Sequence, residues 1–254
     1  MSQLICTGLS GIPLVEPGDD IAALIAGGLD AGGIVPQDGD ILVIAQKIVS
    51  KAQGRYVDLA TVTPGPEAIA LGHKVLRDPH LVEMILAESN AVVKSAPNLL
   101  VVEHRLGLVM ANAGIDQSNI THEHDLDRVL LLPLDPDGAA AQLRQSLAAL
   151  TGVHMGVIIA DSFGRPFRLG VTGVAIGAAG VPALVDMVGQ PDLFGRALQV
   201  TELAIGDELA AMASLVMGQA AEGCPVAHVR GYRSDAPERP ASALVRPREM
   251  DRFR

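Results

Sequence analysis

Short apolar runs recur along the chain, each about as long as a single β-strand. Val and Ile are frequent in these runs, and such β-branched residues favour strands. The runs cover residues 4–9, 41–45, 92–94, 99–103, 108–110, 129–132, 157–160 and 226–229. Turn-forming residues separate several of them. They predict turns at 10–14, 38–40 and 191–195 and a hairpin turn at 104–107.

Longer segments have apolar residues at helical spacing. The first begins after Asp19-Asp20 and is expected to end at Gly27-Gly28, because glycine commonly terminates helices. A helical pattern over 66–88 is broken at Asp78-Pro79. Two further helices are predicted at 135–151 and 201–218, the last with Leu209, Met212 and Val216 on one stripe.

Strands and helices alternate irregularly, which predicts an α+β fold with mixed sheets and helices. The sequence contains neither GxxxxGK[ST] nor GxGxxG, so a P-loop and a Rossmann fingerprint are both excluded. No linker or repeat divides the chain, so residues 1–254 are expected to form one module, with 233–254 as a surface tail.

The charge and cysteine content of the chain disfavour several classes of function. The 254 residues carry 19 Lys and Arg against 29 Asp and Glu, a formal net charge of −10. Such a chain is a poor partner for nucleic acid or an anionic membrane, so an anionic small molecule would need a local basic cluster or a bound metal. Two distant cysteines and the absence of a leader or an apolar span favour a reduced, cytoplasmic protein.

The candidate chemistry is clearest after the apolar run 157–160. Asp161 and Ser162 follow it, and Gly164, Arg165 and Arg168 come next in an expected loop. A carboxylate and a hydroxyl where a buried strand ends, with two guanidinium groups beyond, suit a metal ion and anionic ligands. The alternative is that Asp161 caps a turn and the arginines are solvated.

Two other segments are rich in oxygen donors or small residues, 112–119 and 217–223, and a basic segment covers 46–55. Hard oxygen donors without His or Cys suit Mg²⁺ or Mn²⁺, which bind through one or two carboxylates and substrate phosphates. The alternatives are an ordinary Asx-rich turn and solvated lysines. His122-Glu123-His124 has only weak ligand spacing, and a solvated loop is the preferred interpretation there.

Eight segments together resemble the γ-glutamyl ligase family of coenzyme F420 biosynthesis. In order, they are SGIPLVEPGDD, DGDILVIAQKIVSKAQGR, NAGIDQSN, LLPLDPDG, VIIADSFGRPFRLG, AIGAAG, LFGRALQVTELAIGDELAAMASLVMG and VAHVRGY. The combination of NAGIDQSN with ADSFGRPFRLG is specific. The resemblance implies a two-domain α+β monomer that pairs into a homodimer. It also implies GTP-dependent addition of L-glutamate to the phospholactyl arm of coenzyme F420-0, through an acyl phosphate, and later γ-linked glutamates.

The resemblance also implies roles for individual residues. The metal ligands would be Asp116, Asp161 and Ser162, with Gln219 a less certain one, for Mg²⁺ or Mn²⁺; K⁺ is a further candidate cation. The GTP contacts would be Gly11, Ile12, Pro13, Leu14, Gln46, Lys47, Lys51, Asn119, Met217, Gly218, Gln219, Ala220, Ala221, Glu222, Gly223 and Cys224. We assign Arg165 and Arg168 to the acceptor's carboxylates, beside Asp161. A ligase for another cofactor acid and a non-catalytic nucleotide-binding protein are the alternatives.

Overall fold

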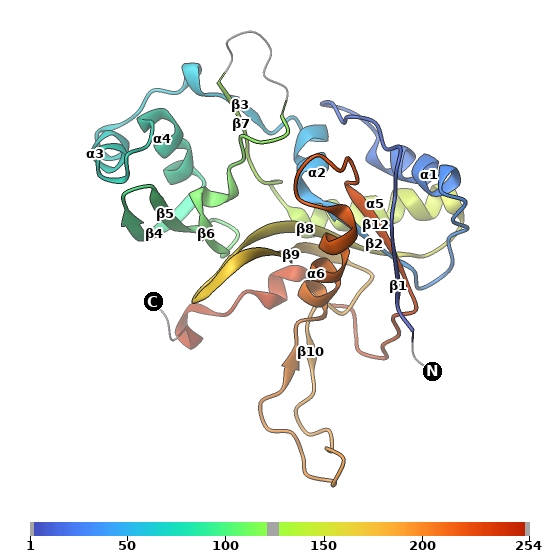
Figure 1. Cartoon of the computed structure of the whole chain (residues 1–254). Coiled ribbons are helices and arrows are strands. Elements are labelled where there is room, and N and C mark those ends of the chain that lie inside the picture. The colour runs from blue at the N-terminus through green and yellow to red at the C-terminus, as the bar shows by residue number, and fades with distance from the viewer. Residues whose placement is uncertain (1–2, 121–126, 252–254) are drawn as a thin grey trace.

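The computed structural model describes residues 3–120 and 127–251. The motif His122-Glu123-His124 lies outside the described residues. Within them, the strands form several separate sheets and helices occur between the strands, which confirms the predicted α+β class (Figure 1). No helix in these two ranges is both long and apolar enough to cross a membrane.

A five-stranded sheet forms the centre of the molecule. Its order is β1 (Ile5–Gly8), β12 (Val226–Arg230), β2 (Ile41–Ala45), β8 (Gly156–Arg165) and β9 (Arg168–Ala179). Only β2 and β8 pair in parallel, in the register Ile41–Gly156 to Ala45–Ala160, and the other neighbours are antiparallel. Because β2 and β8 run the same way, the carboxyl end of β2 at Ala45 lies beside Ala160, and β8 continues beyond it to Arg165.

Both faces of this sheet are covered, as the alternation along β2 shows. Leu42 and Ile44 belong to the core cluster that includes Leu29 of α1 (Ile21–Ala31) and Leu147 of α5 (Pro136–Thr151). Ile41 and Val43 belong to the cluster on the other face, under α6 (Ile205–Met217). Successive side chains of a strand point to opposite faces, so an entirely apolar strand is buried on both sides.

A third core cluster lies in a lobe at one side of the sheet (left in Figure 1). This lobe contains α3 (Pro66–Val75), α4 (Pro79–Ala87) and a three-stranded sheet of β4 (Ser89–Ala96), β5 (Leu99–His104) and β6 (Val109–Ala111). The predicted break at Asp78-Pro79 is confirmed, because the Asp78 side chain caps α4 by accepting the His80 N–H. The pair β3 (Tyr56–Asp58) and β7 (Arg128–Leu130) connects the lobe to the central sheet.

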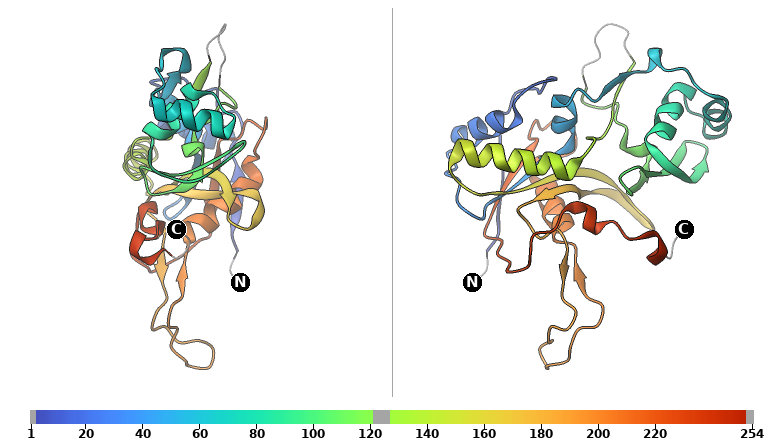
Figure 2. Two further views of the ribbon diagram at one scale, coloured as in Figure 1. Left: turned by 90° about the vertical axis from the view of Figure 1, so that its left-hand side faces the viewer. Right: turned by 180° about the vertical axis from the view of Figure 1, so that it is seen from behind.

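Two hairpins project from the body (Figures 1 and 2). The loop expected after residue 160 is wrong, because β8 continues to Arg165 and pairs with β9 throughout. Beyond Ala160, β2 no longer accompanies β8, so β8 and β9 continue there as a two-stranded ribbon. The second hairpin begins at β10 (Val185–Asp186) and β11 (Glu202–Leu203), and Asp192 forms the predicted turn by accepting the N–H groups of Phe194 and Arg196.

Two predicted helix boundaries are also wrong. The first helix continues through Gly27-Gly28 to Ala31, because Gly28 is buried close to Ile12 and serves packing instead of termination. The last long helix begins at Ile205 and not at 201, since Glu202 and Leu203 pair with β10. Short 3-10 turns occupy Leu59–Thr61, Asn112–Gly114, Ala241–Leu244 and Arg248–Met250.

The C-terminal segment lies along the body. Most of it is exposed, as expected of a surface tail, but Ala241 is buried. The carboxylate of Asp137, in the first turn of α5, accepts the N–H groups of Ala241 and Ser242. These hydrogen bonds attach the C-terminal segment to α5.

Candidate functional site

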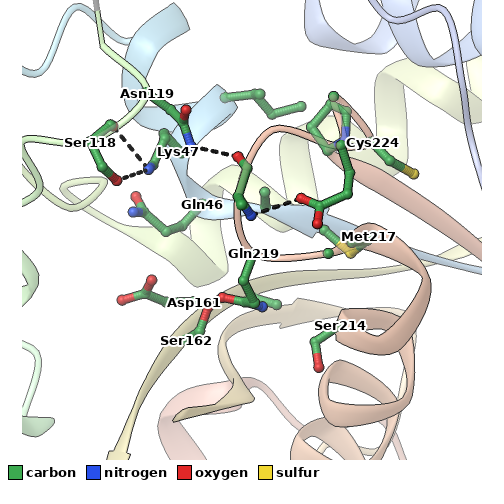
Figure 3. A pocket seen from close by; sticks show the side chains of 18 of the residues that line it. Gln46, Lys47, Ser118, Asn119, Asp161, Ser162, Ser214, Met217, Gln219 and Cys224 are labelled. Carbon is green, nitrogen blue, oxygen red and sulfur yellow. Dashed lines mark hydrogen bonds between the residues drawn. The ribbon is translucent and has the colours of Figure 1, made fainter. Parts of the chain in front are cut away.

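A cavity of about 700 Å³ opens where β2 ends beside Ala160 of β8. Its size is typical of a small-molecule site. Figure 3 shows that polar side chains from several segments converge on it. The wall is formed by residues Ile12–Val15, Ala45–Ile48, Lys51, Asp116, Ser118, Asn119, Ala160–Ser162, Val171, Gly173, Ala210, Ser214 and Met217–Pro225.

The parallel pairing of β2 with β8 brings two of the predicted segments together. Ala45 lies beside Ala160, so the residues that follow them, Gln46 of α2 and Asp161 of β8, both reach the cavity. Helix α2 (Gln46–Ala52) begins immediately after β2. Both Lys47 and Lys51 line the cavity, because residues four apart on a helix share a face.

Lys51 is buried, with 8% of its surface exposed. Burial, and next the charge of Lys47, lowers the pKa of Lys51. No carboxylate in the described part of the chain forms an ion pair with it. The charges of Glu16 and Asp116 oppose this shift without forming an ion pair with Lys51. A buried ammonium that lacks an ion pair is costly, so this position favours an anionic ligand such as phosphate. That environment contradicts the simple interpretation of a solvated lysine.

Asp116 enters the cavity from a strained turn. Asn112, Ala113 and Gly114 all have positive φ values, of 52°, 54° and 66°. The backbone of Asp116 then pairs with Leu130, which fixes its position against β7. Three consecutive left-handed residues are uncommon and cost energy, which is typical of functional loops.

The Asp116 carboxylate is held in its charged form. Lys47 Nζ lies 2.6 Å from Asp116 Oδ2, and Ser118 donates its N–H and its hydroxyl to Asp116 Oδ1. Burial would raise the pKa of Asp116, but the Lys47 ammonium and the Ser118 donors lower it. The segment therefore brings a carboxylate and its own cation to the cavity wall.

Asp161 has the opposite electrostatic environment. Burial raises its pKa to about 6, the Ser162 N–H opposes that shift, and the charge of Asp116 adds to it. Two carboxylates in one cavity repel each other, and a divalent cation between them would relieve both burial and repulsion.

The loop after α6 closes another side of the cavity. Ser162 Oγ donates to Gln219 Oε1 at 2.7 Å, and Asn119 Nδ2 donates to the Ala220 carbonyl oxygen at 3.0 Å. The Glu222 carboxylate accepts the Ala220 N–H inside the loop. These bonds connect three segments that are distant in sequence (Figure 3).

The oxygen donors of the cavity fit a cation only in part. No group of three or more His, Cys, Asp and Glu side chains that could hold a metal occurs among residues 3–120 and 127–251. Asp116, Asp161, Ser162 and Gln219 nevertheless all line the cavity, and all offer oxygen. Mg²⁺ typically binds through one or two carboxylates, waters and substrate phosphates, so the set fits a cation that arrives with a nucleotide.

Most of the predicted nucleotide contacts line the cavity. Ile12, Pro13, Leu14, Gln46, Lys47, Lys51, Asn119 and all residues from Met217 to Cys224 do so. Gly11 does not line it, although it precedes Ile12 directly. Sequence reasoning missed Ser214 and Gly173, which also line the wall. Ser214 lies one turn before Met217-Gly218, and that spacing on a helix is a signal that could have found it.

The two candidate arginines lie elsewhere. Arg165 and Arg168 are exposed near the end of the β8–β9 hairpin, and neither lines the cavity. Arg165 Nη2 is 3.5 Å from the Leu169 carbonyl oxygen. Arg165 lies four residues beyond Asp161 along β8. Each strand residue advances by about 3.3 Å, so the two residues are well separated.

Comparison with known proteins gives a consistent result. The model of the family F420-0:Gamma-glutamyl ligase matches residues 11–231. The "Coenzyme F420:L-glutamate ligase" of Methanothermobacter thermautotrophicus is 48% identical over 252 residues, 97% of each chain. The protein of the same name from Methanopyrus kandleri is 46% identical over the full length of both, and that from Methanocaldococcus jannaschii is 45% identical over 86% of each. The chain therefore belongs to the F420-0:γ-glutamyl ligase family.

Proposed function

We propose that this chain joins L-glutamate to coenzyme F420-0 by an amide bond, with GTP as the energy source. The relatives with near-full coverage are named for ligation of coenzyme F420 and L-glutamate. The single observation that carries the use of a nucleotide is the cavity that collects Lys51, Asp116 and Asp161 from three distant segments. Such a set suits a polyphosphate with a divalent cation.

The proposed chemistry has two steps. A carboxylate oxygen of the phospholactyl arm attacks the γ-phosphorus of GTP, GDP leaves, and an acyl phosphate forms. The amine nitrogen of L-glutamate then attacks the acyl carbon, phosphate leaves, and the amine loses a proton. Further rounds would extend a γ-linked tail.

This chain's residues have distinct parts in that scheme. The ammonium of Lys51, buried in the wall, would bind phosphate oxygens as charge shifts during transfer. Asp116, Asp161, Ser162 and Gln219 would hold Mg²⁺ or Mn²⁺, with K⁺ a further candidate. The divalent ion would neutralise phosphate charge when bound. Residues Ile12 to Leu14 and Met217 to Cys224 would enclose the nucleotide from two sides.

The test is mass spectrometry of the deazaflavin after incubation with the purified protein, GTP, L-glutamate and Mg²⁺ or Mn²⁺. We expect a product heavier by one or more glutamyl residues, with one GDP formed for each residue added. Parallel reactions replace GTP with ATP, omit the metal, or offer another cofactor acid. Product from another acid but not from coenzyme F420-0 contradicts the proposed acceptor.

We also propose that the protein acts as a homodimer. The two projecting hairpins carry apolar side chains that are almost fully exposed: Phe167 95%, Leu169 99%, Leu193 99% and Phe194 95%. Exposed apolar clusters of this kind typically mark protein interfaces. Light scattering should give a dimer, and the double substitution Phe167→Ser with Leu169→Ser should weaken it. The exposed Leu150→Ser is the matched control.

A further inference from the structure

A second hollow, of about 430 Å³, lies beside the main cavity. It is lined by Val109, Phe163, Gly164, Arg165, Pro166, Thr172, Gly173, Val174, Asp207, Glu208 and Ala211. These residues come from the β8–β9 ribbon, the first turns of α6 and β6 of the side lobe. Gly173 lines both this second hollow and the main cavity, so the two spaces adjoin.

The second hollow contains charges of both signs. Arg165 contributes a guanidinium group, and Asp207 and Glu208 contribute carboxyl groups. Asp207 Oδ1 is engaged, because it accepts the Ala175 N–H at 2.9 Å, and burial raises the pKa of Asp207. Glu208 is exposed and forms no ion pair with any residue of the described ranges. One cation and one free carboxylate are thus available to a ligand.

We propose that the second hollow binds the amino-acid substrate, with Arg165 on a carboxylate and Glu208 on the ammonium group. This inference rests on the proposed function, which requires an α-amino acid to reach an activated carboxyl group in the main cavity. A zwitterion with a side-chain carboxylate, such as L-glutamate, matches a site that offers both signs of charge. Planar guanidinium groups bind carboxylates through two parallel hydrogen bonds.

The shared boundary gives the amine a route to the reaction. Gly173 has no side chain, and it pairs with Ser162, which belongs to the wall of the main cavity. An amino group bound next to Gly173 would therefore lie close to the residues that bind the phosphates. In this proposal, Arg165 binds a carboxylate of the amino acid and not a carboxylate of the deazaflavin acceptor.

Gly173 itself is unsuitable as a test. A Cβ atom at this position would clash with the carbonyl oxygen of Ala210 in α6, so a substitution would disturb packing. Arg165 and Glu208 are exposed, so Arg165→Met and Glu208→Gln should fold normally. The matched controls are Arg248→Met and Glu67→Gln, at exposed positions that line neither cavity.

The first measurement is steady-state ligase kinetics with each substrate varied in turn. We expect Arg165→Met and Glu208→Gln to raise the KM for L-glutamate at least tenfold and to change the KM for GTP less than twofold. The controls should match the unmodified protein. If the unmodified protein is active and both variants keep their KM for L-glutamate within twofold, the second hollow is not the amino-acid site. If the unmodified protein forms no glutamylated product, the proposed function itself fails.

The second measurement separates the two contacts by saturation-transfer NMR with L-glutamate and with glutarate, which lacks the amino group. The unmodified protein should prefer L-glutamate. Arg165→Met should weaken both ligands, whereas Glu208→Gln should weaken L-glutamate alone and remove the preference. Equal loss of both ligands in Glu208→Gln, or no loss in either variant, overturns the assigned contacts.

Discussion

Lys47 Nζ lies 2.6 Å from Asp116 Oδ2, so a cation of the protein already occupies one side of the carboxylate proposed to bind a metal. The two side chains are 22% and 27% exposed, and Ser118 contacts both of them. Partly solvated pairs contribute little to folding. The main effect of this pair is on the cavity, because Lys47 keeps Asp116 ionised and in place at the wall before any ligand binds.

Replacing Asp116 should separate function from stability. We expect Asp116→Asn to lower metal-dependent ligase activity at least a hundredfold, because a neutral amide cannot replace the carboxylate charge at a phosphate-bridging cation. The free energy of unfolding should change by less than about 1 kcal/mol, since the lost ion pair is partly exposed. Activity assays and urea unfolding measure the two quantities. Asp30→Asn, on the exposed side of α1, is the control, and near-normal turnover of Asp116→Asn would remove this residue from the metal site.

Metal binding should depend on pH through Asp161. Burial raises the pKa of this carboxyl to about 6 in the ligand-free protein, so the group is largely protonated below that pH. A protonated carboxyl binds cations poorly. The affinity for Mn²⁺ in the presence of GTP should therefore fall as pH decreases from about 7 to 5. Isothermal titration calorimetry across this range measures it, and Asp161→Asn should bind weakly at every pH. A flat profile for the unmodified protein contradicts the assignment.

Lys51 offers a test in which stability and binding move in opposite directions. Burial, and next the charge of Lys47, lowers the pKa of Lys51 and disfavours its charged form in the folded protein, although the charges of Glu16 and Asp116 oppose the shift. Lys51→Met should therefore leave the nucleotide-free protein at least as stable, with an equal or higher Tm. GTP affinity should nevertheless fall by about tenfold or more, which corresponds to about 1.4 kcal/mol. Thermal shift with and without GTP measures both. Lys74→Met, near the end of α3, should change neither.

Acid stability should depend on Asp40, which directly precedes β2 at the opposite end of that strand from the cavity. Burial would raise the pKa of Asp40, but hydrogen bonds from Arg230 and His228 lower it to about 2. A carboxyl with a lowered folded-state pKa stabilises the protein above its unfolded pKa, near 3.9. That stabilisation, about 2 kcal/mol, is lost as pH falls from about 4 to 2.

The variant Asp40→Asn should therefore flatten the stability profile between pH 4 and 2. At pH 7 it should be less stable by about 2 kcal/mol, because the charged form of Asp40 contributes that stabilisation and the Arg230 side chain, 31% exposed, stays partly solvated. Denaturant unfolding at several pH values measures both effects. The exposed Asp235→Asn is the control, and a profile for Asp40→Asn that parallels the unmodified protein would contradict this role.

The local pattern predicted the elements of the sheet well. The apolar run 41–45 coincides with β2, because every position of a strand buried on both faces is in the core. The run 226–229 likewise lies in β12, where the buried His228 is bonded to Asp40. Asp78-Pro79 likewise predicted the division of α3 from α4, since proline is incompatible with a continuous helix. The polar segments around Asp116 and Asp161 were identifiable as candidates for the same reason, as oxygen-rich interruptions after apolar runs.

Where β8 ends could not be read from the apolar pattern. That pattern stops at Ala160, where β2 ceases to accompany the strand, but backbone pairing with β9 continues to Arg165. Hydropathy reports which side chains are buried, whereas strand continuity depends on backbone hydrogen bonds to a neighbour. For this reason the expected loop was wrong, and Arg165 lies in a different hollow from Asp161.

The meeting of Asp116, Asp161 and Lys51 was decided by the tertiary structure alone. Parallel pairing of β2 with β8 places Asp161 beside α2, and the strained turn at Ala113 directs Asp116 towards Lys47. The sequence determined which residues are available for the chemistry, because residue type and local periodicity are encoded position by position. Distances between segments separated by many residues depend on sheet register and long-range packing, and no local pattern contains them.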